Sequence, residues 1–192
     1  MNEKSPGVRA DARLNRQRLI DAALAAFTAH DSNWTLEAIA KDAGVGIGTL
    51  YRNFSSRESL IEAVYRSELA RLCDGAADLL ENLPPDVALR AWMGRYADFV
   101  STKRGMAETL ATVLASGAIT SSDTRQRLGA AVATLLAAGV EKGTLRGDVR
   151  AEDVVASLAG VLLASGSTDQ RPQANRMLDL LMDGVRRRAG GH

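Results

Sequence analysis

The stretch that decides the fold is Thr35–Phe54, which reads TLEAIAKDAGVGIGTLYRNF. Thr35 has the side chain of a helix N-cap. The apolar residues after it recur at helical spacing: Leu36, Ile39, Ala40 and Ala43. Gly44 can enter the left-handed conformation and so end this helix. A second helix of about two turns fits Ile47–Phe54. Two short helices around a glycine turn predict a helix-turn-helix, and therefore DNA binding.

The second of these helices predicts a surface that reads DNA. With Leu50 and Phe54 facing inward at i and i+4, four polar side chains face outward: Thr49, Tyr51, Arg52 and Asn53. Their hydroxyl, guanidinium and amide groups donate to phosphates and read base edges in the major groove. Arg52 is the candidate for direct base readout, because its fork matches O6 and N7 of guanine.

Three glycines, Gly44, Gly46 and Gly48, also raise the alternative of a phosphate-binding loop. That pattern fails because Thr49 takes the place of the third glycine, no strand precedes it and no Gly-Lys-Ser/Thr follows. Gly46 and Gly48 instead leave the start of the recognition helix without side chains, so they offer only close backbone approach. Specificity then rests on few side chains, including Ile47 against a thymine methyl, and on DNA shape.

The composition bounds the class of protein. The chain has 192 residues, of which 46 % are hydrophobic, enough for a core without staples. Its single cysteine, Cys73, excludes an intramolecular disulfide and fits a reducing compartment. No run approaches the roughly 20 apolar residues of a membrane span, and Met1–Asp11 has no apolar leader core. We expect a cytoplasmic protein with no membrane partner.

Charge is concentrated at the N-terminus, although the net charge of the chain is only +1. Residues Met1–Ile20 hold five basic and two acidic side chains. The basic ones are Lys4, Arg9, Arg13, Arg16 and Arg18. Pro6 and Gly7 favour a mobile arm before a first helix that begins near Arg13, and such arms reach into minor grooves. The alternative is a solvated tail whose charge is incidental.

No stretch alternates with the period of a strand, so the chain is predicted to be all-α. Outside the helix-turn-helix, a helix starting at Ser55 or Ser56 runs to Pro84-Pro85, long enough to join a DNA-reading head to a body. The other predicted helices are Arg13–Ala29, Asp86–Thr102, Met106–Ser116, Ser122–Gly143, Glu152–Ser165 and Pro172–Arg188.

The motif resembles the N-terminal domain of the TetR family of transcriptional regulators. The likeness runs over Arg13–Tyr65 and is specific, because a generic helix-turn-helix would not require Thr49-Leu50-Tyr51 or Arg57-Glu58. It implies about nine helices: a three-helix DNA-binding domain at residues 1–55, joined by the long helix to a ligand-binding and dimerisation domain at 56–192.

The resemblance also implies roles for single residues. At matching positions the family suggests that Thr35 and Tyr51 hold phosphates, that Thr49 touches a phosphate or base, and that Arg57 pins the DNA backbone. The full expected DNA-binding set is Arg13, Thr35, Gly46, Ile47, Gly48, Thr49, Tyr51, Arg52, Asn53 and Arg57.

The ligand-binding and dimerisation domain, residues 56–192, is expected to bind a small-molecule inducer. Its aromatic and sulfur side chains gather on two helices and suit an adaptable apolar pocket. The expected ligand-binding residues are Trp92, Met93, Tyr96, Phe99, Met106, Leu110, Val113 and Leu114. Arg95 or Glu108 could orient a polar end of the ligand. The alternative is that these residues are simply core.

The last two helices, within residues 152–188, are apolar over more than one face. A second copy of the chain can cover the additional face, and the resemblance implies a four-helix interface with two helices from each copy. The alternative is a pair buried within one monomer. A two-fold dimer would select a palindromic operator.

Catalysis is not expected, and neither is a metal or other cofactor. The two histidines, His30 and His192, build no triad or metal site with the other residues, and carboxylate pairs such as Glu152 and Asp153 suit helix starts. The sequence therefore predicts a repressor released from its operator by an apolar or amphipathic inducer. The alternative class is a helical protein-interaction module without specific DNA binding.

Overall fold

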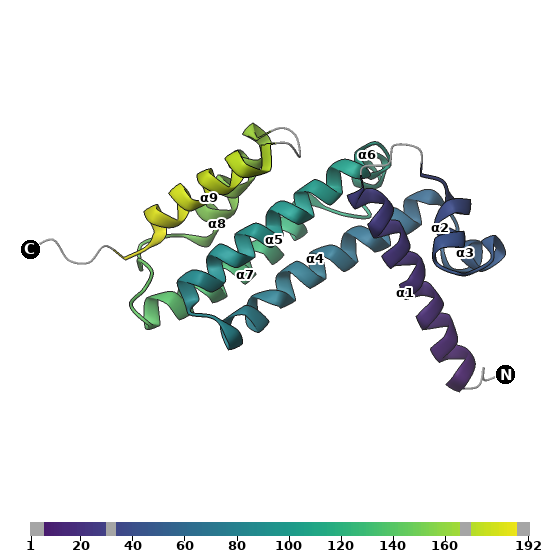
Figure 1. The fold of residues 1–192 in the computed structure, drawn as a ribbon, viewed down its shortest axis with the longest axis horizontal. Coiled ribbons are helices and arrows are strands. Elements are labelled where there is room, and N and C mark those ends of the chain that lie inside the picture. Colours follow the sequence, from purple (N-terminus) through teal and green to yellow (C-terminus); the bar gives the residue numbers. More distant parts are fainter. Residues whose placement is uncertain (1–5, 30–33, 166–169, 188–192) are drawn as a thin grey trace, which may run out of the picture. The chain divides into compact units, whose positions relative to one another are not determined.

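The computed structural model describes residues 6–29, 34–165 and 170–187. Over these residues the fold is all-α, as predicted, and contains nine helices (Figure 1). Their bounds are α1 Pro6–Thr28, α2 Leu36–Asp42, α3 Ile47–Asn53, α4 Arg57–Asn82, α5 Pro85–Gly105, α6 Ala107–Ala115, α7 Ser121–Glu141, α8 Ala151–Ala164 and α9 Arg171–Val185. In the part of the chain so described, no helix is long and apolar enough to span a membrane.

The chain forms two compact units. The head unit comprises residues 1–67 and 101–119, and the body unit comprises residues 68–100 and 120–192. Both units take part of α4 and part of α5. The expected boundary between residues 55 and 56 stays a prediction about independently folding domains.

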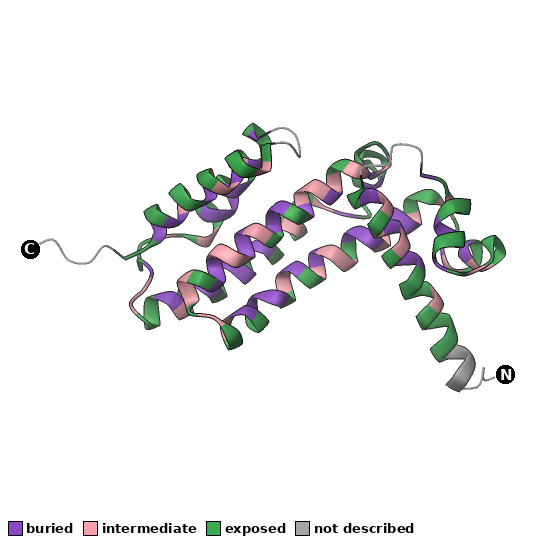
Figure 2. Cartoon of the chain, in the orientation of Figure 1, coloured by how far each residue is buried: buried purple, intermediate pink, exposed green. Residues whose placement is uncertain are grey.

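The first helix begins earlier than the sequence pattern suggested. α1 starts at Pro6, not near Arg13, so the expected mobile arm is helical from Pro6 onward. Proline suits the first turn of a helix because its missing N–H has no partner there anyway. Residues 10–14 are exposed, as the green stretch of α1 in Figure 2 shows, whereas Phe27 near the end of the helix is fully buried. Lys4, in the first part of the expected arm, lies outside the described residues.

The long helix α4 is capped at Ser56, one of the two serines predicted for this role, and it ends before the two prolines, as predicted. The Ser59 N–H donates to the Ser56 hydroxyl at 3.2 Å, and the Ser56 N–H donates to the Ser59 hydroxyl at 3.1 Å. This exchange satisfies two backbone donors that the helix leaves without partners, so it fixes where α4 starts.

In the body unit, α7 and α8 pack together and α9 packs on α8. The N-cap of α7 is Thr120, whose hydroxyl accepts the Asp123 N–H at 3.2 Å. The prediction that Ser122 caps this helix is therefore wrong. Thr120 takes this role because its backbone is extended, whereas Ser122 already lies in the first turn.

Candidate nucleic-acid interface

The turn between α2 and α3 has the geometry that the sequence indicated. The Thr35 hydroxyl accepts the Ala38 N–H at 3.1 Å and caps α2. Gly44 has φ +68°, a conformation that costs other residues steric strain. Leu50 and Phe54 are buried at 0 % and 2 % exposure, and they fix one face of α3 against the head.

The opposite face of α3 presents side chains to solvent. Tyr51 is 49 % exposed and Ile47 is 38 % exposed. Arg52 is exposed, while Thr49 and Asn53 are partly buried. This face therefore combines a guanidinium, a phenol, a hydroxyl, an amide and an apolar group on about two turns of helix.

Hydrogen bonds along α3 organise its polar groups. The Arg52 guanidinium donates to the Thr49 hydroxyl at 2.9 Å. The Asn53 side-chain amide donates to the Thr49 carbonyl at the same distance. Thr49 thus orients both neighbours one turn away, in addition to any contact of its own.

Two glycines, Gly46 and Gly48, flank Ile47 at the start of α3. A Cβ atom built on Gly46 or on Gly48 would meet no other heavy atom within 4 Å. The fold has room for a side chain at both positions. Neither glycine has the positive φ that would favour glycine there. A partner outside the chain is then a reason for the absence of side chains.

Two other helices of the head unit, α1 and α4, also carry exposed arginines. Arg13 is exposed on α1, as is Arg57 at the start of α4. The guanidinium of Arg57 lies over the Trp34 ring, with 3.5 Å from its central carbon to the ring centroid. That of Arg16 lies over the Phe54 ring at 4.5 Å. Sequence reasoning missed both stacks, because nothing in the local sequence links residues so far apart.

The eight expected ligand-binding residues do not fall in one compact unit. Trp92, Met93, Tyr96 and Phe99 belong to the body unit, and Met106, Leu110, Val113 and Leu114 belong to the head unit. All are buried except Leu114, which is 37 % exposed. Trp92 stacks on Tyr96 with ring centroids 5.9 Å apart, and its indole N–H donates to the Leu72 carbonyl at 2.9 Å.

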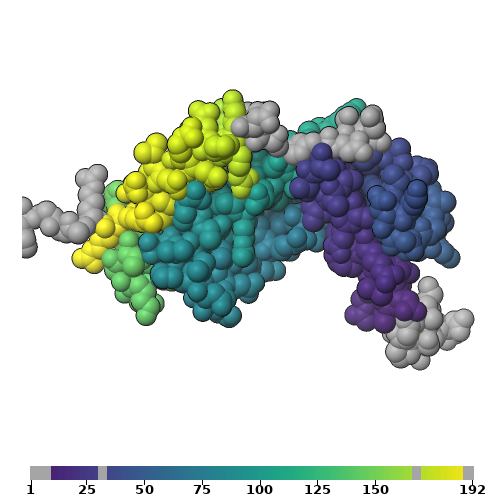
Figure 3. All heavy atoms as spheres, viewed as in Figure 1, coloured from purple at the N-terminus to yellow at the C-terminus, as the bar shows by residue number. Residues whose placement is uncertain are grey.

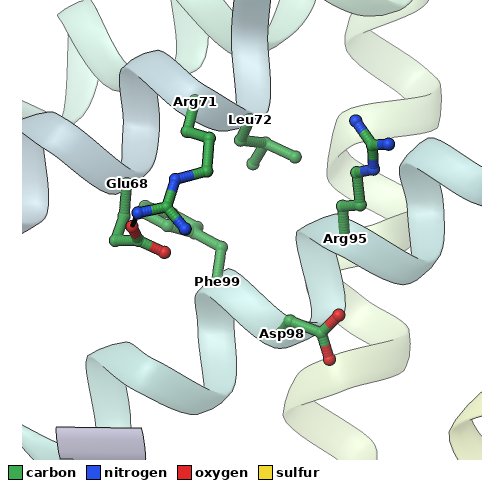
Figure 4. Close-up of a pocket in the computed structure, with 6 residues that line it drawn as sticks. All are labelled: Glu68, Arg71, Leu72, Arg95, Asp98 and Phe99. Carbon is green, nitrogen blue, oxygen red and sulfur yellow. Dashed lines mark ion pairs between the residues drawn. The ribbon is translucent and has the colours of Figure 1, made fainter. Parts of the chain in front are cut away.

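A cleft of about 250 Å³ lies between α4 and α5 in the body unit (Figure 4). Its lining residues are Glu68, Arg71, Leu72, Arg95, Asp98 and Phe99. Of the expected apolar set only Phe99 lines it, together with Arg95, the expected polar anchor. Arg71 pairs with Glu68 at 2.8 Å, and Arg95 donates to the Gly75 carbonyl at 3.4 Å. The cleft is therefore apolar at Leu72 and Phe99 and charged around them.

The last two helices keep apolar side chains in solvent. Leu163 on α8 is 83 % exposed and Leu180 on α9 is 72 % exposed, although both helices also bury a full apolar face. In Figure 3 the yellow atoms of α9 lie at the surface of the body unit. A second apolar face, as the sequence indicated, is therefore available on these helices.

Within the described ranges no cluster of three or more His, Cys, Asp or Glu side chains could hold a metal. His30 and His192 lie outside these ranges. Burial raises the pKa of the Cys73 thiol, which is the opposite of what a nucleophilic thiolate needs.

Two family matches cover most of the chain. Residues 19–64 match the family described as bacterial regulatory proteins, tetR family, and residues 84–187 match the family described as transcriptional regulator SbtR-like, C-terminal domain. The chain belongs to the TetR family, whose members are non-enzymatic DNA-binding transcription factors. It is a transcriptional regulator with a helix-turn-helix DNA-binding domain.

Solved structures agree with this assignment over the whole fold. The chain is 48 % identical to the TetR transcriptional regulator SCO0520 from Streptomyces coelicolor, with a TM-score of 0.82 over 91 % of this chain and 99 % of that one. It is 28 % identical to a TetR regulatory protein from Mycobacterium vanbaalenii, with a TM-score of 0.74 over 94 % and 99 % of the two chains. The HTH-type regulator SrpR of Pseudomonas putida is 44 % identical over 59 residues, 30 % of this chain and only 28 % of SrpR.

Proposed function

We propose that this regulator is a homodimeric repressor that binds a palindromic operator through α3 and leaves it when a small molecule binds the body unit. The observation that carries the proposal is the outer face of α3, where Arg52, Tyr51 and Ile47 are exposed beside the two glycines Gly46 and Gly48. A protein that binds chromosomal DNA in this way would act in the cytoplasm.

The roles on this face follow from chemistry. Arg52, held by Thr49, has the planar fork that pairs with guanine O6 and N7, so it reads a base. Tyr51, Thr35, Arg57 and Arg13 donate to phosphates and set the register of the protein on the duplex. The glycines at the start of α3 let the backbone approach the DNA, and Ile47 covers a thymine methyl.

Two copies would form the reading unit through α8 and α9. The exposed Leu163 and Leu180 support this, because burial against a second copy would remove their apolar surface from water. Two-fold symmetry then places two α3 helices on half-sites one helical turn, or a multiple of it, apart.

The inducer would bind in the cleft between α4 and α5 of the body unit. Phe99 and Leu72 offer apolar contact, and Arg95 offers donors to a polar end, so an amphipathic molecule suits the site. Such a ligand releases DNA only if it binds more tightly to the conformation whose heads are wrongly spaced.

The test of the reading role compares two variants on an operator duplex and on versions with single base changes, by fluorescence anisotropy. Arg52→Ala should lose preference at one base position of each half-site, by about 1–3 kcal/mol. Tyr51→Phe should weaken binding to all sequences alike. Equal losses on every sequence for Arg52→Ala would remove its readout role.

The salt dependence of binding separates this proposal from a protein-interaction module. A dimer that contacts several phosphates loses affinity steeply as salt rises, with a slope of about −0.9 per contact. An interaction module would show no duplex binding to lose.

A further inference from the structure

The Arg57 side chain stacks on a pair of packed aromatic rings in the head unit. Its guanidinium lies 3.5 Å from the centroid of the Trp34 ring. Trp34 is only 6 % exposed, and its ring meets the fully buried Phe27 edge to face, with centroids 4.9 Å apart and planes at 65°. A ring clamped in this way by the core offers a fixed face to a surface arginine.

Stacking orients the guanidinium without consuming its donors. The ring engages the face of the planar group, whereas its five N–H bonds lie in the plane and point outward. Among the described residues, no ion pair includes Arg57. The cation is therefore held in one orientation while its hydrogen-bonding edge can take an anion.

The chain brings this pair to the start of two helices. Arg57 is the first residue of α4 and follows the Ser56 cap, so its backbone is fixed. Trp34 directly precedes Thr35, the N-cap of α2. The backbone of both partners is thus anchored by a cap, which leaves only the side-chain rotamers to be ordered.

We propose that Trp34 is a positioning residue for DNA binding: it holds the Arg57 guanidinium ready for one phosphate of the DNA backbone. A long arginine side chain loses rotamer freedom when it binds, and a side chain ordered beforehand has less to lose. This inference rests on the proposed DNA-binding function, and the wild-type control below separates the two.

The test is a double-mutant cycle in the full-length protein, read by fluorescence anisotropy on a mixed-sequence duplex of about 30 base pairs, roughly three helical turns. A phosphate contact does not depend on sequence, so the operator is not needed. Arg57→Met keeps an apolar group on the ring but removes the charge. Near 0.1 M salt it should weaken DNA binding about tenfold for each protomer that loses its phosphate contact. Arg127→Met, on α7, changes the net charge equally and should bind like wild type.

Trp34→Leu should weaken binding at least about fivefold in the wild-type background, from the ordering of two arginines per dimer. In the Arg57→Met background the same substitution should change binding less than about twofold, because the side chain it positions is gone. Trp34→Phe keeps an aromatic face and should recover most of the loss. Equal losses in both backgrounds would mean that Trp34 acts only through core packing, and would overturn the proposal.

Arg57→Lys provides a second test that leaves the core intact, should Trp34→Leu fail to fold in thermal melting. Lysine keeps the charge but lacks the planar group that stacks, so binding should still fall about threefold or more. Binding equal to wild type would show that charge alone matters and would refute the role of Trp34. Absence of duplex binding by wild type would refute the proposed function itself.

Discussion

Gly48→Ala should make the protein more stable and yet a poorer DNA binder. Gly48 is the second residue of α3, and a Cβ built there would meet no heavy atom of the chain within 4 Å. Since no clash opposes the new methyl group, only the helix propensity changes within the fold. The methyl would, however, stand on the face that we propose lies against the DNA.

The expected gain follows from the difference between glycine and alanine in a helix, about 0.5–1 kcal/mol. For a chain of this size that gain corresponds to a rise in the melting temperature of roughly 1–4 °C. The methyl would hold the backbone of α3 away from the duplex and should cost about tenfold or more in affinity, comparable with one lost phosphate contact.

Both effects can be measured on the same preparation, by circular dichroism melting and by fluorescence anisotropy on a selected duplex. Gly129→Ala on α7 is the matched control, because its Cβ would also meet nothing within 4 Å. It should give a similar gain in stability and leave DNA affinity unchanged. A Gly48→Ala protein that melts higher and binds DNA as tightly as wild type would refute the assignment of this face.

Three further variants test the packing and the assembly. Leu163→Glu combined with Leu180→Glu should convert the proposed dimer to a monomer in sedimentation velocity, since both side chains are exposed in one chain and charges in an apolar interface are costly; a persistent dimer would place the interface elsewhere. Gly105→Ala should destabilise the fold by about 3 kcal/mol, because its Cβ would overlap the Phe27 carbonyl oxygen; urea unfolding like that of wild type would contradict this packing. Burial lowers the pKa of Lys103 in the folded protein, so the unfolded state binds the proton of this side chain more tightly. The free energy of unfolding of wild type should therefore rise with pH between the pKa of Lys103 in the folded state and its pKa in the unfolded state. Lys103→Met should therefore be more stable than wild type near pH 7 and lose this advantage toward about pH 10 in urea unfolding, and an advantage independent of pH would refute the shift.

Local signals explain what could be predicted from the sequence. The cap at Thr35, the turn at Gly44 and the two prolines after α4 each act through their own backbone, so their effect is readable from neighbouring residues. The predicted start of α1, near Arg13, is wrong because Pro6 lies in the first turn of the helix, a position that proline also favours. The cap of α7 was misplaced within Thr120-Ser121-Ser122, where three hydroxyls compete and the backbone decides.

Contacts between distant residues account for what the sequence did not reveal. Nothing in the pattern around Trp34 indicates that Arg57 stacks on it, because the contact joins the residue before the cap of α2 to the first residue of α4. Helical periodicity likewise predicts that Trp92 and Met93 face the interior, but it does not distinguish a core residue from one that lines a cavity. Both are fully buried, and the cleft is lined instead by charged groups such as Glu68 and Arg71.

The central claim is that two copies of this chain read a two-fold DNA site with α3. The most direct measurement is selection of random duplexes by the purified protein, followed by sequencing of what it retains. An inverted repeat with half-site centres one helical turn, or a multiple of it, apart is the predicted result. No enriched sequence from a protein shown to be folded and dimeric would contradict the claim.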